Sequence, residues 1–185
     1  MEQMEVLAQC GLSALVALLQ RSPGPPASAI SIDAAGQPTV PAGASGVLLA
    51  PALRDLLATG QRKLELPTLH EPWMLAPALA EYARRSGQAV CLRWAGSTGS
   101  GACVAVGGPR GPLHLHGWRS ESPASWSCRL QFLDQPAEPL ADLTVAADEE
   151  AELLAAARRS GLTVRTTDWE AAVAAARDFL VGDQP

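Results

Sequence analysis

Aromatic residues other than tryptophan are scarce in this chain. Its 185 residues contain 2 Phe and 1 Tyr, whereas Trp totals 5 and the hydrophobic share is an ordinary 48%. A core of Ala, Leu and Val packs helices closely, and we expect the tryptophans to fill its larger gaps. A chain of this length buries roughly 70% of its unfolded surface. It therefore needs neither a disulfide nor a metal to fold, and we predict one domain over residues 1–185.

Positive charge is also in short supply. The formal net charge is -5 at pH 7. Neutralising nucleic-acid phosphates requires a concentrated basic surface, so we predict no nucleic-acid partner. The basic doublets lie where helices are expected to end or strands to begin, and cations at a helix C-terminus complement its dipole. These doublets are Arg62-Lys63, Arg84-Arg85 and Arg158-Arg159.

Long apolar runs and closely spaced cysteine pairs are missing as well. No stretch approaches the ~20 apolar residues of a membrane-spanning helix, so we predict no membrane partner. The apolar segment 10–19 is short and follows Glu2 and Glu5 rather than basic residues, which is untypical of a signal peptide. The 4 cysteines form no Cys-x-x-Cys pair, and we expect buried free thiols in a cytoplasmic protein.

Hydrophobic periodicity predicts helices and a hairpin within residues 1–87. Pro51 is expected in the first turn of a helix, where no amide donor is needed. Pro77 predicts a helix that begins with a distorted turn and is regular from this residue onward. The expected elements are a helix at 4–20, a hairpin with strands at 29–32 and 38–40, a helix at 51–59, a strand at 64–66 and a helix at 71–86.

Residues 88–133 alternate between apolar and polar and predict an antiparallel β-meander. Its strands are expected at 89–94, 102–106, 113–118 and 126–132, joined by Gly, Ser and Pro clusters. Residues 142–181 predict strand, helix, strand and helix, at 143–145, 148–160, 162–165 and from 167 onward. Asp148 is the expected cap of the first helix, and Thr167 with Glu170 has the spacing of a capping box. We therefore predict an α+β fold, with the meander packed against N-terminal, central and C-terminal helices.

The sharpest local motif is Leu113-His-Leu-His-Gly-Trp118. On a strand, His114 and His116 point to the same face, together with Trp118. Two such imidazoles bind zinc or another transition metal if a third ligand arrives from elsewhere. The candidates for that ligand are Cys103, Cys128 and His70. The alternative is an ordinary sheet face with no evident cofactor.

Other catalytic patterns receive little support. Residues 96–101 are rich in Gly and Ser, but a strand follows them rather than a helix, which favours a hairpin turn over a phosphate-binding loop. The cysteines stand in apolar or alternating stretches that raise a thiol's pKa. A Cys128–His116 dyad across neighbouring strands is conceivable, although no motif selects it. Glu149 and Glu150 are expected in solvent at a helix N-terminus.

A second candidate site is the loop that carries His70, Glu71 and Trp73. It joins a predicted strand to a predicted helix, where α/β proteins often place ligand contacts. An imidazole, a carboxylate and an indole there are consistent with a small-molecule pocket. The alternative is structural, with Trp73 docking the helix and Glu71 near its N-terminus.

Part of the chain resembles an uncharacterised bacterial domain-of-unknown-function family. The resemblance rests on Val47-Leu-Leu-Ala-Pro-Ala-Leu-Arg-Asp55, Leu64-Glu-Leu66, Pro72-Trp-Met-Leu-Ala-Pro77 and Ala89-Val-Cys-Leu-Arg-Trp94. The Asp168-Trp169 helix is similar to the family's C-terminal end. The resemblance covers residues 47–95 and that helix. It implies a compact bacterial accessory protein and assigns no catalytic residue.

These observations favour a non-catalytic binding or accessory protein. Tryptophan is enriched where interfaces concentrate their binding energy, and Trp94, Trp118 and Trp126 fall in or beside the predicted sheet. We expect them to form a patch for an enzyme subunit, another protein or a second copy of the chain. The alternatives are a metal-dependent enzyme or metal-binding protein using His114 and His116, and a small-molecule protein using the His70–Trp73 loop.

Overall fold

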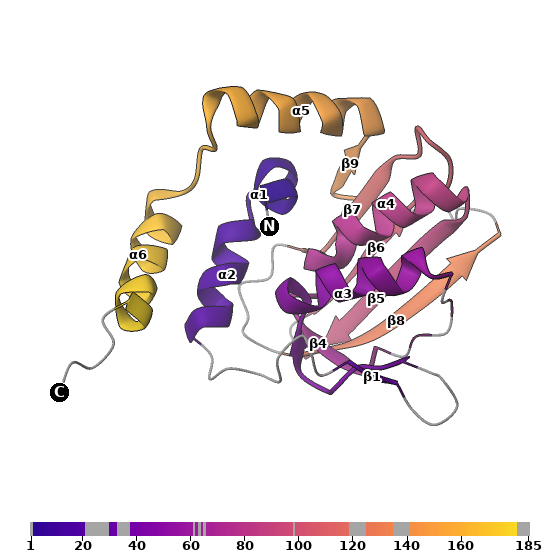
Figure 1. Cartoon of the computed structure of the whole chain (residues 1–185), viewed down its shortest axis with the longest axis horizontal. Helices are drawn as coiled ribbons and strands as arrows, with labels where there is room; N and C mark the ends of the chain where they lie inside the picture. The colour runs from indigo at the N-terminus through magenta and orange to yellow at the C-terminus, as the bar shows by residue number, and fades with distance from the viewer. Residues whose placement is uncertain are drawn as a thin grey trace.

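A computed structural model shows helices packed on one face of a β-sheet, which confirms the predicted α+β class (Figure 1). The side chains of Ile32 and of residues 176–180 are not described. The structure describes residues 2–20, 30–32, 38–60, 62, 64, 66–97, 99–118, 125–134 and 141–180.

Within that part of the chain, the main sheet has seven strands in the order β3-β4-β8-β5-β6-β7-β9. The predicted meander is correct for the first three of its strands, which pair consecutively and antiparallel. The fourth returns to the other side of the first, so the prediction of a continuous meander is wrong. These four strands, β5 (Ala89–Gly96), β6 (Gly99–Ala105), β7 (Leu113–His116) and β8 (Trp126–Leu133), make the spatial order of a Greek key.

The burial of β5 explains this arrangement. Its residues 89–92 are all buried, which is typical of a central strand with a neighbour at each edge. Pairing with β8 along seven residues, from Ala89↔Leu133 to Ala95↔Ser127, completes the second edge. The alternation of apolar and polar residues predicts which side chains share a face, but it does not predict which strand pairs with which.

Short strands finish the two edges of the sheet. At one edge β4 (Thr68–His70) pairs antiparallel with β8, and β3 (Ala44–Ser45) pairs parallel with β4. At the other edge the predicted strand β9 (Leu143–Val145) pairs with β7. Residues 64 and 66 of the strand expected at 64–66 are not in a strand, residue 65 lies outside the described residues, and the strand begins at Thr68. The predicted hairpin is present as β1 (Ser31–Ile32) and β2 (Pro38–Thr39), and its turn at 33–37 lies outside the described residues.

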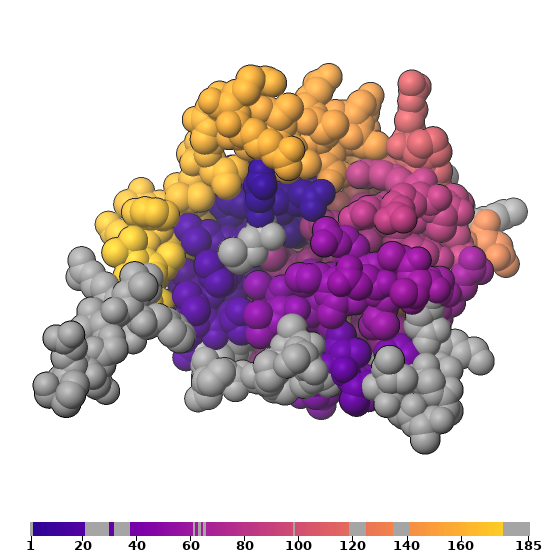
Figure 2. All heavy atoms as spheres, in the orientation of Figure 1, coloured from indigo at the N-terminus to yellow at the C-terminus, as the bar shows by residue number. Residues whose placement is uncertain are grey.

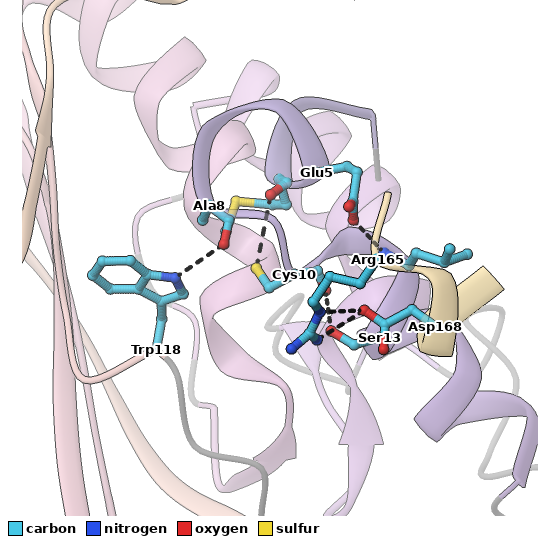
Figure 3. Close-up of polar contacts among 9 residues, drawn as sticks. Glu5, Ala8, Cys10, Ser13, Trp118, Arg165 and Asp168 are labelled. Atoms are coloured by element: carbon cyan, nitrogen blue, oxygen red, sulfur yellow. Dashed lines mark hydrogen bonds and ion pairs between the residues drawn. The ribbon is translucent and has the colours of Figure 1, made fainter. Parts of the chain in front are cut away.

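The N-terminal helix expected at 4–20 is in fact two helices, α1 (Glu2–Ala8) and α2 (Gly11–Gln20). Gln9 has a left-handed backbone with φ 50° and interrupts the helix. The break is held by side chains: Leu12 N donates to Glu5 Oε2 at 2.7 Å, and Ser13 Oγ donates to Cys10 O at 3.1 Å (Figure 3). Glu5 therefore caps α2 from a position that the periodicity places inside one continuous helix.

Helix α3 (Gly46–Ala58) begins five residues before the expected position. Ser45 is its N-cap and accepts a hydrogen bond from Val47 N at 3.2 Å. Pro51 consequently lies inside the helix, and the prediction that it stands in the first turn is wrong. The distorted start of the next helix is confirmed, because the 3-10 turn η2 (Pro72–Leu75) precedes α4 (Ala76–Ser86). Both α3 and α4 lie across the same face of the sheet (Figure 1).

The C-terminal helices α5 (Ala147–Ser160) and α6 (Thr166–Leu180) pack against α1 and α2 respectively (Figure 2). The strand expected at 162–165 is not formed, and Asp148 is inside α5 rather than at its cap, which is Ala146. Glu150 is buried, not solvated as expected. It pairs with Arg84 Nη2 at 2.6 Å and accepts from Gln3 Nε2 at 2.8 Å, so it connects α5 to α4 and α1.

Within the described residues, no helix has both the length and the apolar composition that a membrane crossing requires.

Candidate functional site

The three tryptophans expected to form a surface patch lie in the core instead. Trp94, Trp118 and Trp126 are 2%, 2% and 1% exposed. Trp94 on β5 and Trp126 on β8 lie on the helix-covered face of the sheet, where both pack against Trp73. Trp118 lies beyond the end of β7, after Gly117 with its left-handed φ of 66°, so it is buried and does not share a strand face with His114 and His116 as predicted. The prediction that these three tryptophans form an exposed patch for a partner is therefore wrong, because their side chains are buried in the core.

Glycines make room for two of these indoles. A Cβ at Gly101 would stand 2.4 Å from Trp94 Nε1, and a Cβ at Gly96 would stand 3.0 Å from Trp126 Cε3. Trp73 enters from η2 and packs on both, with ring-centroid distances of 6.2 Å to Trp94 and 6.4 Å to Trp126. Gly96 pairs with Gly99 and Trp94 with Gly101, so β5 and β6 are joined as a hairpin, as expected; residue 98 of its turn lies outside the described residues.

Trp118 has a different structural role. Its Nε1 donates to the carbonyl of Ala8 at 3.5 Å, at the end of α1 (Figure 3). The residue follows β7 and is 2% exposed. It therefore docks the N-terminal helices against the sheet.

The loop carrying His70, Glu71 and Trp73 is also organised by internal contacts. Glu71 is buried, has a left-handed backbone with φ 46°, and accepts a hydrogen bond from Ser45 Oγ at 3.1 Å. Because Ser45 is the cap of α3, this carboxylate supports the start of that helix. Trp73 is 5% exposed and packs in the core, while His70 is half-buried. The small-molecule pocket stays a prediction, and these contacts fit the structural alternative.

The metal-ligand candidates are divided between the two faces of the sheet. His114 pairs with Val104 and His116 with Ala102, whereas Cys103 pairs with Leu115 on the covered face. Strand spacing places β8, with Cys128, about 14 Å from β7, and β4, with His70, about 19 Å from it. Among the described residues, no group of three or more His, Cys, Asp or Glu is arranged to hold a metal ion. The predicted metal site would thus contain two imidazoles on one face of the sheet, and the described residues supply no third ligand beside them.

Each of the two histidines has a partner at the sheet edge. His114 Nδ1 lies 2.9 Å from Thr144 Oγ1, and His116 Nδ1 lies 3.1 Å from Asp142 Oδ2. Burial lowers the pKa of His114, which favours its neutral form. The expected dyad of His116 with Cys128 is wrong as a neighbouring-strand pair, because β5 and β6 lie between them.

Three thiols have the raised pKa that the sequence predicts. Burial raises the pKa of Cys128 to about 12, and burial together with the nearby Glu5 carboxylate raises that of Cys10 to about 12. Burial also raises the pKa of Cys103 well above its ordinary value. A thiol in such surroundings is protonated at neutral pH and is a poor nucleophile or metal ligand.

The opposite, open face of the sheet carries a groove of about 530 Å³. One cross-strand row runs through it, from Arg129 on β8 to Arg93 on β5, Ala102 on β6 and His116 on β7. The next row supplies only small side chains, those of Ser127, Ala95 and Ser100. We define these seven residues as the open-face groove. Small residues form its floor, and basic residues stand at both ends of the long row.

The two arginines are the most unusual feature of the groove. Arg93 and Arg129 are directly opposite each other on adjacent antiparallel strands, and both are exposed. Side chains in such positions have Cβ atoms roughly 5 Å apart, and like charges there are destabilising. None of the ion pairs formed by the described residues includes either arginine. The structure therefore holds two neighbouring positive charges on the surface of an acidic protein.

A second hollow with arginines provides a contrast. It is about 260 Å³ in volume and is bordered by Arg54, Arg62 and Arg85. Glu81 also borders it and pairs with Arg85 at 3.5 Å. The hollow adjoins the C-terminal ends of α3 and α4, whose helix dipoles disfavour an anion. Arginine alone therefore does not distinguish the open-face groove; the difference is that Glu81 lines the second hollow, whereas no Asp or Glu is among the described residues that line the groove.

Sequence reasoning missed Arg93 and Arg129, although it placed both in predicted strands. Alternation assigns each of them to the face opposite its apolar neighbours. Their juxtaposition depends on the pairing of β8 with β5, which the sequence did not predict. The signal available in the sequence was that Arg93 and Arg129 are each the single charged residue of a predicted strand.

Comparisons with protein-family models, curated proteins and solved structures gave no match to this chain. The resemblance of residues 47–95 to an uncharacterised bacterial family therefore stays a prediction.

Proposed function

We propose that the chain is a non-catalytic binding protein that holds an anionic group of its partner in the open-face groove. The observation that carries the proposal is the direct opposition of Arg93 and Arg129 without an acidic partner among the described residues. An isolated like-charge pair lowers stability, whereas an anion between the guanidiniums converts repulsion into two attractive, charge-assisted hydrogen-bonded contacts.

The surroundings of the pair support recognition. The small side chains of Ala95, Ser100, Ala102 and Ser127 leave space beside it, and the groove volume of about 530 Å³ is within the range of small-ligand sites. The covered face meanwhile contributes rigidity, because Trp94 is packed directly behind Arg93 on the same strand. The proposed role is still the accessory role expected from the sequence, but the binding site lies on the face of the sheet opposite the tryptophans.

The test is the thermal stability of the protein in sulfate or phosphate, compared with chloride at equal ionic strength. A ligand that binds only the folded state stabilises it by about 2.7 kcal/mol at one hundred times its Kd. We expect the multivalent anions to raise the Tm of the wild type. We expect Arg93→Gln and Arg129→Gln to remove most of that increase. Arg85→Gln is the matched control, because it deletes an exposed arginine from the other hollow.

An equal anion effect in the wild type and in both groove variants would overturn the proposal. Loss of the effect in Arg85→Gln alone would move the anion to the hollow between α3 and α4. Both groove substitutions alter exposed side chains, so circular dichroism is expected to show unchanged folding.

A further inference from the structure

We infer that the group held by Arg93 and Arg129 is a phosphomonoester dianion rather than a carboxylate. The inference rests on the proposed function and names the ligand class of the same groove. It follows from the number and geometry of the positive charges, from the shape of the floor and from the charge at the far end of the groove.

Charge matching is the first step. Two arginines face each other in the register of β5 and β8, so the site presents two positive charges side by side. A carboxylate carries one negative charge and is satisfied by one guanidinium fork. A phosphomonoester carries about −1.5 to −2 charges at pH 7 and has three terminal oxygens. It can therefore accept hydrogen bonds from both forks and neutralise both charges.

The geometry of arginine gives the second step. Each guanidinium is a planar fork of donors that matches phosphate bidentately, which lysine cannot reproduce. With Cβ atoms roughly 5 Å apart, the two flexible side chains can converge on one group above the strands. Ser127 stands two residues before Arg129 on the same face, in the floor of the groove, and brings a hydroxyl into the next row.

The far end of the groove orients the ligand. His116 is paired there with Asp142 at 3.1 Å, and Asp142 also accepts from Gly117 N at 2.8 Å. His116 is therefore already engaged by a carboxylate, whereas the two arginines have no ion pair among the described residues, so the phosphate occupies the arginine end. The body of the ligand lies over Ala102 and Ser100 toward the pair of His116 and Asp142. That body is neutral or carries hydrogen-bond donors, as in a phosphorylated side chain of a peptide or a small phosphorylated metabolite.

The experiment compares three probes by isothermal titration at constant ionic strength and pH 7.5. They are O-phosphoserine, glutamate, and a neutral pentapeptide with phosphoserine at its centre. We expect O-phosphoserine to bind at least tenfold more tightly than glutamate. Arg93→Gln and Arg129→Gln should each weaken phosphoserine binding about tenfold or more, and Arg93→Lys should weaken it several-fold although the charge is kept. Arg85→Gln should bind like the wild type.

The outcomes separate the two proposals. Glutamate binding as tightly as phosphoserine, through the same two arginines, overturns the phosphomonoester assignment and leaves the anion-binding function in place. Failure of every probe to bind, or binding unaffected by either groove substitution, overturns both. Tighter binding of the pentapeptide than of free phosphoserine assigns the phosphate to a protein partner. Equal or weaker binding of the pentapeptide assigns it to a small molecule, and the ligand class is supported in either case.

Discussion

The two faces of strand β5 have opposite characters within a single alternating sequence. Trp94 points to the covered face and is 2% exposed, whereas its neighbour Arg93 points to the open face and is exposed. Behind Trp94 stand Gly101 and the ring of Trp73; beside Arg93 stands a second arginine. The difference shows that one face of the sheet stabilises the fold, while the other face is available for binding. One face is packed tightly enough to tolerate an electrostatically unfavourable arrangement on the other.

The largest contrast is expected from alanine substitutions at these adjacent positions. Trp94→Ala removes a fully packed indole and should lower the free energy of unfolding by about 3–5 kcal/mol. Arg93→Ala deletes an exposed side chain without an ion-pair partner among the described residues and should change stability by less than about 1 kcal/mol. Urea denaturation followed by circular dichroism measures both. Comparable losses for the two variants would contradict the division between the faces.

Gly101→Ala tests the packing of the covered face without removing any atom. The added Cβ would meet Trp94 at 2.4 Å and the carbonyl of His116 at 2.5 Å, so the strand or the indole must move. We expect a loss of about 1–3 kcal/mol in the free energy of unfolding. Ser100→Ala, one residue earlier and exposed, is the matched control and should be near neutral. A neutral Gly101→Ala would show that the tryptophan cluster is loosely packed.

On the open face, removing one arginine should stabilise the ligand-free protein slightly. Arg129→Gln relieves the repulsion from Arg93, and opposed like charges are worth about 0.2–1 kcal/mol. The gain should shrink as salt is added, because exposed charges are screened. Urea denaturation at low and high ionic strength measures it. A loss of stability at low salt would mean that Arg129 makes a favourable contact in the free protein.

How much of this architecture is readable from the sequence differs between the faces. Alternation located the four strands around Trp94, Cys103, Leu115 and Trp126. It did not give their register, which places Cys103 opposite Leu115 and therefore on the other face from His116. It could not show that the tryptophans are buried, because an apolar face looks the same whether helices or a partner cover it. It also could not show that Arg93 faces Arg129, since that depends on the long return of β8 to β5. The predicted helix boundaries are wrong where a single capping side chain determines them. Ser45 does so before α3, and Glu5 does so at the break before α2.

Thiol chemistry gives a smaller test of the covered face. Cys128 lies opposite Trp94, and burial raises its pKa to about 12. At pH 8 only about 10⁻⁴ of such a thiol is ionised. We expect Ellman's reagent to label Cys128 and Cys10 far more slowly in the folded protein than in urea. Rapid labelling of Cys128 without denaturant would place its sulfur on the open face.

The smallest expected effect is the titration of His114. Burial lowers its pKa below the ordinary value of 6.5, so the unfolded chain binds the proton more readily. Above pH 6.5 His114 is neutral in both states and does not oppose folding. As the pH falls from 6.5 toward the lowered pKa of His114 in the folded state, protonation of the unfolded chain reduces the free energy of unfolding. Over this pH interval the Tm of the wild type should fall more than the Tm of His114→Gln. Parallel curves for the two proteins would contradict the burial of the imidazole.

The most direct test of an anion-binding open face is a titration of the isotope-labelled protein with phosphate, observed by two-dimensional NMR. The account predicts that the side-chain Nε–H signals of Arg93 and Arg129 shift together, with the amides of Ser127 and Ala95, while those of Trp94 and Trp126 indoles stay in place. Shifts confined to the hollow of Arg54, Arg62 and Arg85, or no shifts at the two opposed arginines, would contradict it.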